Sequence, residues 1–197
     1  MARTTKRFQE TVKYFKKMTK VRYWVQFAED KTYISEGHFI AVMPTCFYDT
    51  YIIPSVAGMP RYNKEDTTYE IENGELKFST VNFKQMLNDK SESFSIETKP
   101  TTMLFEIERN RIARGFIWNN DGEYTGALIN EEYFKVSKDF SDGNGKYRCT
   151  KKTAPIITSS YDDEFIFMVL PIHYDYDTDF QMIIDALNKP EIAEKAA

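Results

Sequence analysis

Residues 21–43, VRYWVQFAEDKTYISEGHFIAVM, decide the fold class because they hold three strand-like runs separated by two short turns. The runs span residues 21–27, 32–35 and 38–43 and are rich in β-branched and aromatic residues, which are the residue types that strands favour. Charged residues and Gly37 separate them, as is typical of turns. This stretch therefore predicts an antiparallel meander.

A second strand-rich segment follows the first. Residues 67–72 and 75–79 flank Asn73-Gly74, a strong hairpin signal because both residues tolerate positive φ. The turn at Lys99-Pro100 is expected to separate two further strands. The remaining strand-like runs lie at 93–97, 101–107, 111–118, 124–129, 146–150 and 154–158, and a buried central strand is predicted at 164–170.

Several short helices are expected between the strands. Helix signals occur at 45–53, which Pro54 should end, at 81–89, and at 131–138. The expected caps of the second and third helices are Thr80 and Asn130. A strand followed at once by a capped helix recurs at 38–53, 75–89 and 124–138, and a last helix is expected after Thr178.

These elements predict an α+β fold in which antiparallel β meanders carry short helices on one face. A division into two related halves near residues 54–66 is left open, because Gly58, Pro60 and Asn63 mark a linker or long loop there. The expected segments are a basic amphipathic helical arm at 1–20, a small meander and helix unit with a linker loop at 21–66, an α+β unit at 67–189, and a tail at 190–197.

Composition excludes several classes of protein. The net charge is −4, aromatic residues make up 15% of the chain, and the longest apolar run, 165–172, is far shorter than the roughly 20 residues that span a bilayer. The start of the chain is polar where a signal peptide would be apolar. With only Cys46 and Cys149, we expect reduced thiols, a cytoplasmic location and no membrane partner.

The first twenty residues concentrate positive charge on a helix. Residues 4–20 place Phe8, Val12, Phe15 and Met18 near helical spacing. Most lysines lie off that stripe, namely Lys13, Lys16, Lys17 and Lys20. Two interpretations stay open: an arm docked through its aromatic stripe with solvated lysines, or a surface for nucleic acid, anionic lipid or an acidic partner.

No catalytic residue, metal site or cofactor is predicted. His38 and Cys46 lie at opposite ends of a predicted strand, roughly 25 Å apart by strand rise, too far for a thiol and its base. The sequence contains no Cys-x-x-Cys pair, which is the usual sign of a structural zinc site. The alternating carboxylates at 175–179 lack the glycine and glutamate of a calcium loop, because Phe180 and Ala186 stand at those positions.

Three stretches resemble a domain of the bacterial sliding clamp, the processivity ring of DNA polymerase, over residues 75–172. ELKFSTVNFKQML at 75–87 looks like the opening strand and inner helix, YTGALINEEYFKVS at 124–137 like the second strand-to-helix step, and EFIFMVLPI at 164–172 like the closing strand. Residues 1–66 match no complete clamp domain.

The resemblance implies a homo-oligomeric ring whose inner helices pass over duplex DNA without reading its sequence, with polymerase-type proteins as partners. The phosphate contacts that it implies are Lys84, Lys90, Lys135 and Lys138.

The leading prediction of function is therefore a non-enzymatic DNA-binding accessory protein that resembles a processivity factor. The alternative is a protein-interaction or inhibitor domain that binds a basic partner through an acidic, tyrosine-rich surface. That surface would consist of Tyr174, Asp175, Tyr176 and Asp177.

Overall fold

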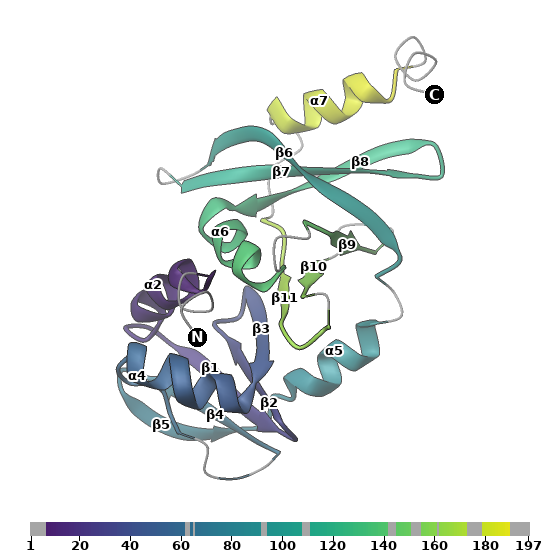
Figure 1. The fold of residues 1–197 in the computed structure, drawn as a ribbon. Coiled ribbons are helices and arrows are strands. Elements are labelled where there is room, and N and C mark those ends of the chain that lie inside the picture. Colours follow the sequence, from purple (N-terminus) through teal and green to yellow (C-terminus); the bar gives the residue numbers. More distant parts are fainter. Residues whose placement is uncertain are drawn as a thin grey trace.

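In the part of the chain that the computed structural model describes, eleven strands lie in one antiparallel sheet (Figure 1). The structure describes residues 7–61, 64, 66–91, 94–107, 111–141, 145–150, 155–160, 162–172 and 179–189. The strands are β1 (Tyr23–Ala28), β2 (Lys31–Ser35), β3 (Phe39–Pro44), β4 (Thr67–Glu72), β5 (Glu75–Ser79), β6 (Ile96–Ile107), β7 (Arg111–Asn120), β8 (Glu123–Asn130), β9 (Tyr147–Cys149), β10 (Ile156–Ser159) and β11 (Ile166–Val169). Their order along the sheet is β5-β4-β1-β2-β3-β11-β10-β9-β6-β7-β8.

Helical segments connect and cover these strands. They are α2 (Gln9–Met18), α3 (Thr45–Phe47), the π-helix η1 (Tyr48–Ile52), α4 (Ile53–Ser55), α5 (Phe83–Ser91), α6 (Glu131–Phe140) and α7 (Asp179–Leu187). The predicted α+β class and the antiparallel meanders are confirmed. The predicted division of the chain into segments stays a prediction.

The centre of the sheet joins two similar units. A helix followed by a three-stranded meander occurs twice, as α2-β1-β2-β3 and as α6-β9-β10-β11. The last strands of the two units pair with each other, with Phe39 opposite Val169 and Ala41 opposite Phe167. This repeated unit has a helix before a meander. The strand followed by a helix that the sequence predicted also recurs, as β3 with the helical stretch from Thr45, β5 with α5, and β8 with α6.

Helices lie on both faces of the sheet, because alternate residues of a strand point to opposite faces. Phe39, Ala41 and Met43 of β3 belong to a core cluster with residues of α2 and α6. Ile40 and Val42 of the same strand pack with residues of α5. The sequence predicted helices on one face only, and could not reveal this arrangement because both faces of the central strands are apolar.

The second face also carries α7. Ala113 and Leu128 pack with Phe180 and Ile184 of this helix. Two glycines lie directly beneath this helix. A Cβ at Gly115 would lie 2.8 Å from the Phe180 ring, and a Cβ at Gly126 would lie 2.7 Å from the same ring. The close approach of α7 to β7 and β8 therefore requires glycine at these positions.

Local signals identified several elements correctly. Asn73 and Gly74 have φ of 53° and 81° and form the expected hairpin turn between β4 and β5. The side chain of Asn130 accepts a hydrogen bond from the Glu132 amide at 2.9 Å, as expected for the cap of α6. The helical stretch from Thr45 begins where predicted.

Two predicted interruptions were wrong. Lys99-Pro100 lies inside the continuous strand β6, whose register with β7 shifts between Pro100 and Leu104; the irregular pairing accommodates the missing proline N–H. Pro54 lies within α4, directly after the π-helix η1, and the helical stretch continues to Ser55.

The start of α5 depends on a distant residue. The predicted cap, Thr80, was wrong, because the amide of Gln85 donates to the side chain of Asn82 at 3.0 Å. The buried Gln26 of β1 accepts from the amides of Phe83 at 2.7 Å and Lys84 at 3.1 Å. Its own amide donates to Asn82 at 3.1 Å, so Gln26 anchors the helix to the sheet.

Substitution of Gln26 should therefore destabilise the fold. Gln26→Leu keeps the volume but removes the acceptor from two amides, which should lower the free energy of unfolding by about 1–3 kcal/mol in urea denaturation. Gln85→Leu makes the same change at an exposed position of α5 and should stay within about 0.5 kcal/mol of the parent. Equal effects of the two substitutions would contradict this role of Gln26.

Candidate nucleic-acid interface

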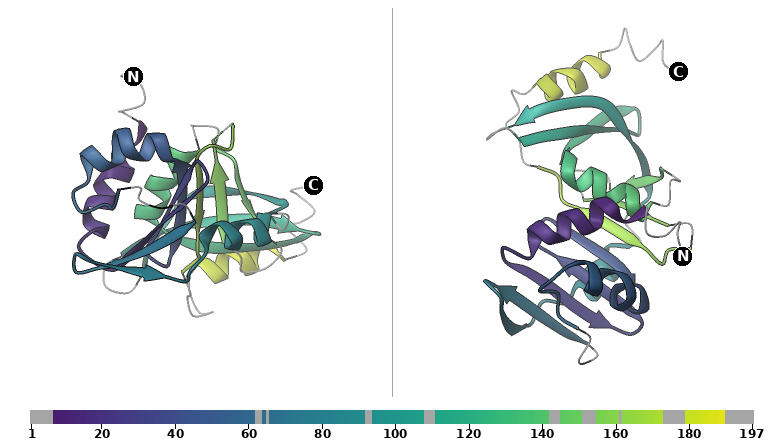
Figure 2. Two further views of the ribbon diagram at one scale, coloured as in Figure 1. Left: turned by 90° about the horizontal axis from the view of Figure 1, so that it is seen from below. Right: turned by 60° about the vertical axis from the view of Figure 1, so that its left-hand side comes forward.

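Helices α2 and α6 lie side by side on the same face of the sheet (Figure 2). The aromatic stripe of α2 is docked as predicted: Phe8, Phe15 and Met18 are buried. Phe15 stacks on Phe39 of β3 with ring centroids 6.4 Å apart, and Phe8 meets Phe140 of α6 at 5.6 Å. The first turns of α2 are thus held by both the sheet and α6.

Docking of this stripe leaves the lysines of α2 on the surface. At about 100° per residue, residues 13, 16, 17 and 20 fall on the side of the helix opposite the buried stripe. Two lysines of α6 are also exposed, and one of them, Lys135, lines the groove between the two helices. The surface formed by the exposed side chains of Lys13, Lys16, Lys17, Lys20, Lys135 and Lys138 is called the lysine face below.

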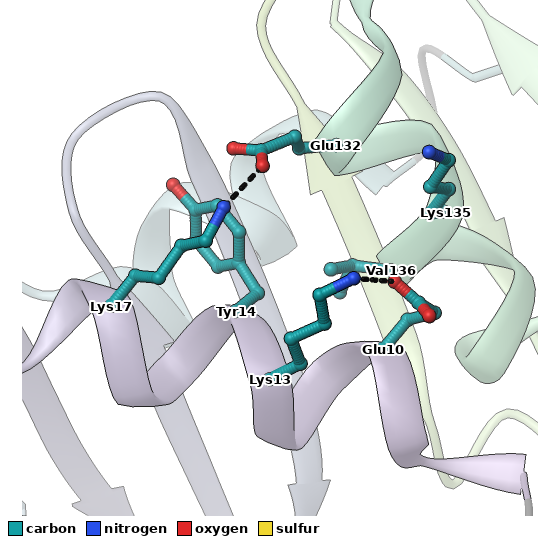
Figure 3. Close-up of a pocket in the computed structure, with 7 residues that line it drawn as sticks. All are labelled: Glu10, Lys13, Tyr14, Lys17, Glu132, Lys135 and Val136. Carbon is teal, nitrogen blue, oxygen red and sulfur yellow. Dashed lines mark hydrogen bonds and ion pairs between the residues drawn. The ribbon is translucent and has the colours of Figure 1, made fainter.

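Acidic side chains neutralise part of the lysine face. Lys13 lies 3.7 Å from Glu10, and Lys17 forms an ion pair with Glu132 across the two helices (Figure 3). The ammonium of Lys138 lies 4.6 Å from the centroid of the Phe134 ring. Because exposed ion pairs contribute little stability, these contacts leave the lysines available to phosphate groups.

Three lysines of this face have no ion-pair partner among the described residues: Lys16, Lys20 and Lys135. The groove between the helices holds a cavity of only about 40 Å³, lined by Glu10, Lys13, Tyr14, Lys17, Glu132, Lys135 and Val136 (Figure 3). That volume holds no more than a few water molecules. The lysine face is therefore a surface suited to an extended partner and not a pocket for a small molecule.

A carboxylate shared by two tyrosines fixes α2 and α6 relative to the sheet. The hydroxyl of Tyr14 donates to Glu36 at 2.7 Å, and the hydroxyl of Tyr133 donates to the same oxygen. Burial, followed by the hydrogen bond to Glu36, raises the pKa of both tyrosines. Both hydroxyls therefore remain protonated donors, and they join one residue from each helix to the turn after β2.

A second carboxylate links the helices at the start of α2. Asp139 accepts from the amide of Thr11 at 2.8 Å and from its hydroxyl at 2.7 Å. No side chain of α2 caps its own first turn, so Asp139 supplies the cap from α6. Arg7 donates to the backbone carbonyl of Asp139 at 2.6 Å. Burial raises the pKa of Asp139 to about 6, although the hydrogen bonds from Thr11 lower it.

The structure separates the lysines that the sequence grouped together. Lys84 lies on α5, on the opposite face of the sheet, and pairs with Glu29 at 2.5 Å. Lys90 is also on α5, but its side chain falls outside the described residues. The acidic surface at 174–177 lies outside them as well. Six of the eight predicted DNA contacts therefore share one face.

The residues that hold the lysine face together were not predicted. Tyr14, Glu36 and Tyr133 come from three distant segments, and nothing in the sequence marks them as partners. Asp139 follows the helix predicted at 131–138, and nothing in the sequence marks it as buried or Thr11 as its partner.

The thiols and imidazole show no catalytic arrangement in the described part of the chain. His38 and Cys46 are exposed at opposite ends of β3, and burial raises the pKa of Cys149 to about 12. Within the described ranges, no three His, Cys, Asp or Glu side chains gather as metal ligands would. No described helix combines the length and apolar character needed to cross a membrane.

A larger concavity lies over β6, β9 and β10. Its volume is about 460 Å³, and its lining consists of Ser95, Glu97, Lys146, Arg148, Ser159, Ser160 and Asp163. Glu97 and Arg148 are opposite each other in neighbouring strands, so charges of both signs meet there. This lining has no histidine or cysteine and gives no favoured sign of charge for a ligand.

No protein-family model matches the sequence, and no curated protein matches it. Among solved structures, the chain is similar to a crystal structure described as a candidate DNA polymerase III beta subunit from Eubacterium rectale ATCC 33656, with a TM-score of 0.39 and 14% identity. The match covers 85% of this chain and 64% of that chain. At this TM-score, the likeness between the folds supports no conclusion about function.

The burial of Asp139 should make stability depend on pH. Because burial raises the pKa of Asp139 from 3.8 to about 6, ionisation of Asp139 destabilises the fold as pH rises through this window, and the penalty is complete above about pH 6. Asp139→Asn keeps an acceptor for Thr11 and cannot ionise.

Between pH 4 and pH 7, we expect the free energy of unfolding of the Asn variant, relative to the parent, to increase by about 2–3 kcal/mol. Urea denaturation across that range measures it. A difference between the two proteins that stays constant with pH would show that Asp139 does not titrate in this window.

Proposed function

We propose that this protein is a non-enzymatic accessory factor that holds duplex DNA against the lysine face of α2 and α6. The observation that supports the proposal is the convergence of six exposed lysines on two adjacent helices. We also propose that it acts in a processivity-like role, as a homo-oligomer with polymerase-type proteins as partners.

The spacing of the lysines on α2 suits a phosphate backbone. Residues 13–20 rise about 10 Å along the helix, which corresponds to about three phosphates of one DNA strand. Lysine contacts to phosphates position a protein without reading base sequence. We therefore expect binding that tolerates any duplex sequence.

Charge elsewhere sets the strength of this binding. The net charge of −4 opposes DNA at long range, and Glu10 and Glu132 lie within the lysine face. Glu131 faces Arg114 in a bidentate pair at 2.8 and 2.9 Å, which reduces its repulsion of DNA. Binding should consequently be weak and should fall steeply as salt rises.

The test removes the three lysines of this face that lack a described ion pair. For the Lys16→Gln, Lys20→Gln, Lys135→Gln triple variant, fluorescence anisotropy with a duplex of about 30 base pairs should show weaker binding at low salt. The slope of log K against log salt should become shallower by about 2–3, since each lost phosphate contact contributes about 0.9.

A matched control removes the same number of charges from the other face of the sheet. Lys84 lies on α5. Lys31 points to the same side of β2 as Tyr33 of the α5 cluster, and Lys99 is opposite Ile117 of the α7 cluster. The triple variant Lys31→Gln, Lys84→Gln, Lys99→Gln should retain the parent slope. If both triple variants lost DNA affinity equally, net charge alone would explain the effect, and the proposal would be contradicted.

Failure of the parent protein to bind duplex DNA at low salt would also contradict the proposed DNA-binding function. That result would favour the alternative interaction domain, whose acidic residues 174–177 lie outside the described part of the chain.

A further inference from the structure

The two ends of the sheet are protected differently. At β8, the side chain of Asn188 accepts from the Tyr124 amide at 2.7 Å and donates to the Tyr124 carbonyl at 2.8 Å. The amide of Ile172 donates to the carbonyl of Leu128 at 2.8 Å. At the other end, no strand among the described residues pairs with the outer edge of β5.

The unprotected strand exposes large apolar side chains. Leu76 is 51% exposed and Phe78 is 78% exposed. They pair with Ile71 and Tyr69 of β4, which belong to the core cluster on the α2 side, and the Phe78 and Tyr69 rings lie 5.6 Å apart. The apolar face of the sheet therefore continues beyond the core to an open edge, a combination that favours pairing with another strand.

The hairpin turn determines which backbone groups face that edge. Positive φ at both Asn73 and Gly74 is typical of a two-residue type I′ turn, in which the flanking residues Glu72 and Glu75 bond to each other. Hydrogen-bonding direction alternates along a strand. The N–H and C=O groups of Leu76 and Phe78 consequently point outward.

We propose that the outer edge of β5 pairs antiparallel with β5 of a second copy of this chain, with Leu76 opposite Leu76 of the second copy. Outward-facing groups allow symmetric pairing centred on residue 76, 77 or 78. Centring on Lys77 sets two lysines opposite each other, and centring on Phe78 sets Lys77 opposite Ser79. Only the pairing centred on Leu76 places Glu75 of each copy opposite Lys77 of the other.

The same register gives Phe78 a partner. It lies opposite Gly74 of the second copy, and a Cβ at Gly74 would have nothing within 4 Å. An aromatic ring can cover a glycine across two strands without a clash. Packing and charge thus select the same alignment.

The symmetry of this pairing has a consequence for the lysine face. Two antiparallel neighbouring strands are related by a two-fold axis perpendicular to the sheet, so an isologous pair keeps the same face of both sheets on one side. The α2 and α6 helices of both copies would then lie on that side. The dimer itself does not depend on DNA binding and is tested without DNA.

A single strand of five residues buries little surface, so we expect a weak dimer below the standard interface size. Sedimentation velocity of the full chain from 1 to 200 μM, in the absence of DNA, should show a monomer converting to a dimer. Phe78→Lys places a charge on the exposed edge and should raise the dissociation constant at least about tenfold. Its circular dichroism should match that of the parent, because the side chain is exposed.

Charge exchange tests the register. Glu75→Lys sets lysine opposite lysine and Lys77→Glu sets glutamate opposite glutamate, and each should raise the dissociation constant about fivefold. The double variant Glu75→Lys, Lys77→Glu restores opposite charges and should return to within about twofold of the parent. A chain that stays monomeric at 200 μM would overturn the proposal, as would a dimer unaffected by Phe78→Lys. Failure of the double variant to recover would overturn the register.

Discussion

The pairing of β3 with β11 is the contact on which the rest of the structure depends. It joins strands more than a hundred residues apart in the chain, with Ile40 opposite Met168 and Val42 opposite Ile166. Through it, the two helix-plus-meander units share one sheet, and α2 and α6 share one face of that sheet. Because contacts of such long sequence separation form late, we expect this pairing to be slow to fold.

Aromatic packing explains why the two helices meet above this junction. Phe39 and Phe167 face each other across the central strands with ring centroids 5.2 Å apart, and Phe140 of α6 lies 5.4 Å from Phe167. Phe165 contacts Phe8 of α2 at 4.9 Å. The high aromatic content of the chain is thus accounted for by a core between helices and sheet, and stacking platforms for bases are not needed to explain it.

The sequence predicted what local physics determines. The Asn73-Gly74 hairpin, the Asn130 cap and the amphipathic α2 each follow from adjacent residues, and all are present. Partners from distant segments could not be predicted: Glu36 between two tyrosines, or Asp139 at Thr11. For the same reason, the sequence grouped Lys84 with Lys135, although alternation along β3 places their helices on opposite faces.

The cap that Asp139 supplies to α2 also constrains synthesis of the protein. Thr11 precedes its partner by 128 residues, so at about 5–20 residues per second the ribosome takes roughly 6–26 s to complete the binding site for the start of α2. Until then, Phe15 can already stack on Phe39, but Phe8 lacks the ring of Phe140 and α2 lacks its cap. During this time, the lysines between the aromatic residues of α2 oppose aggregation of the helix segment through their positive charge.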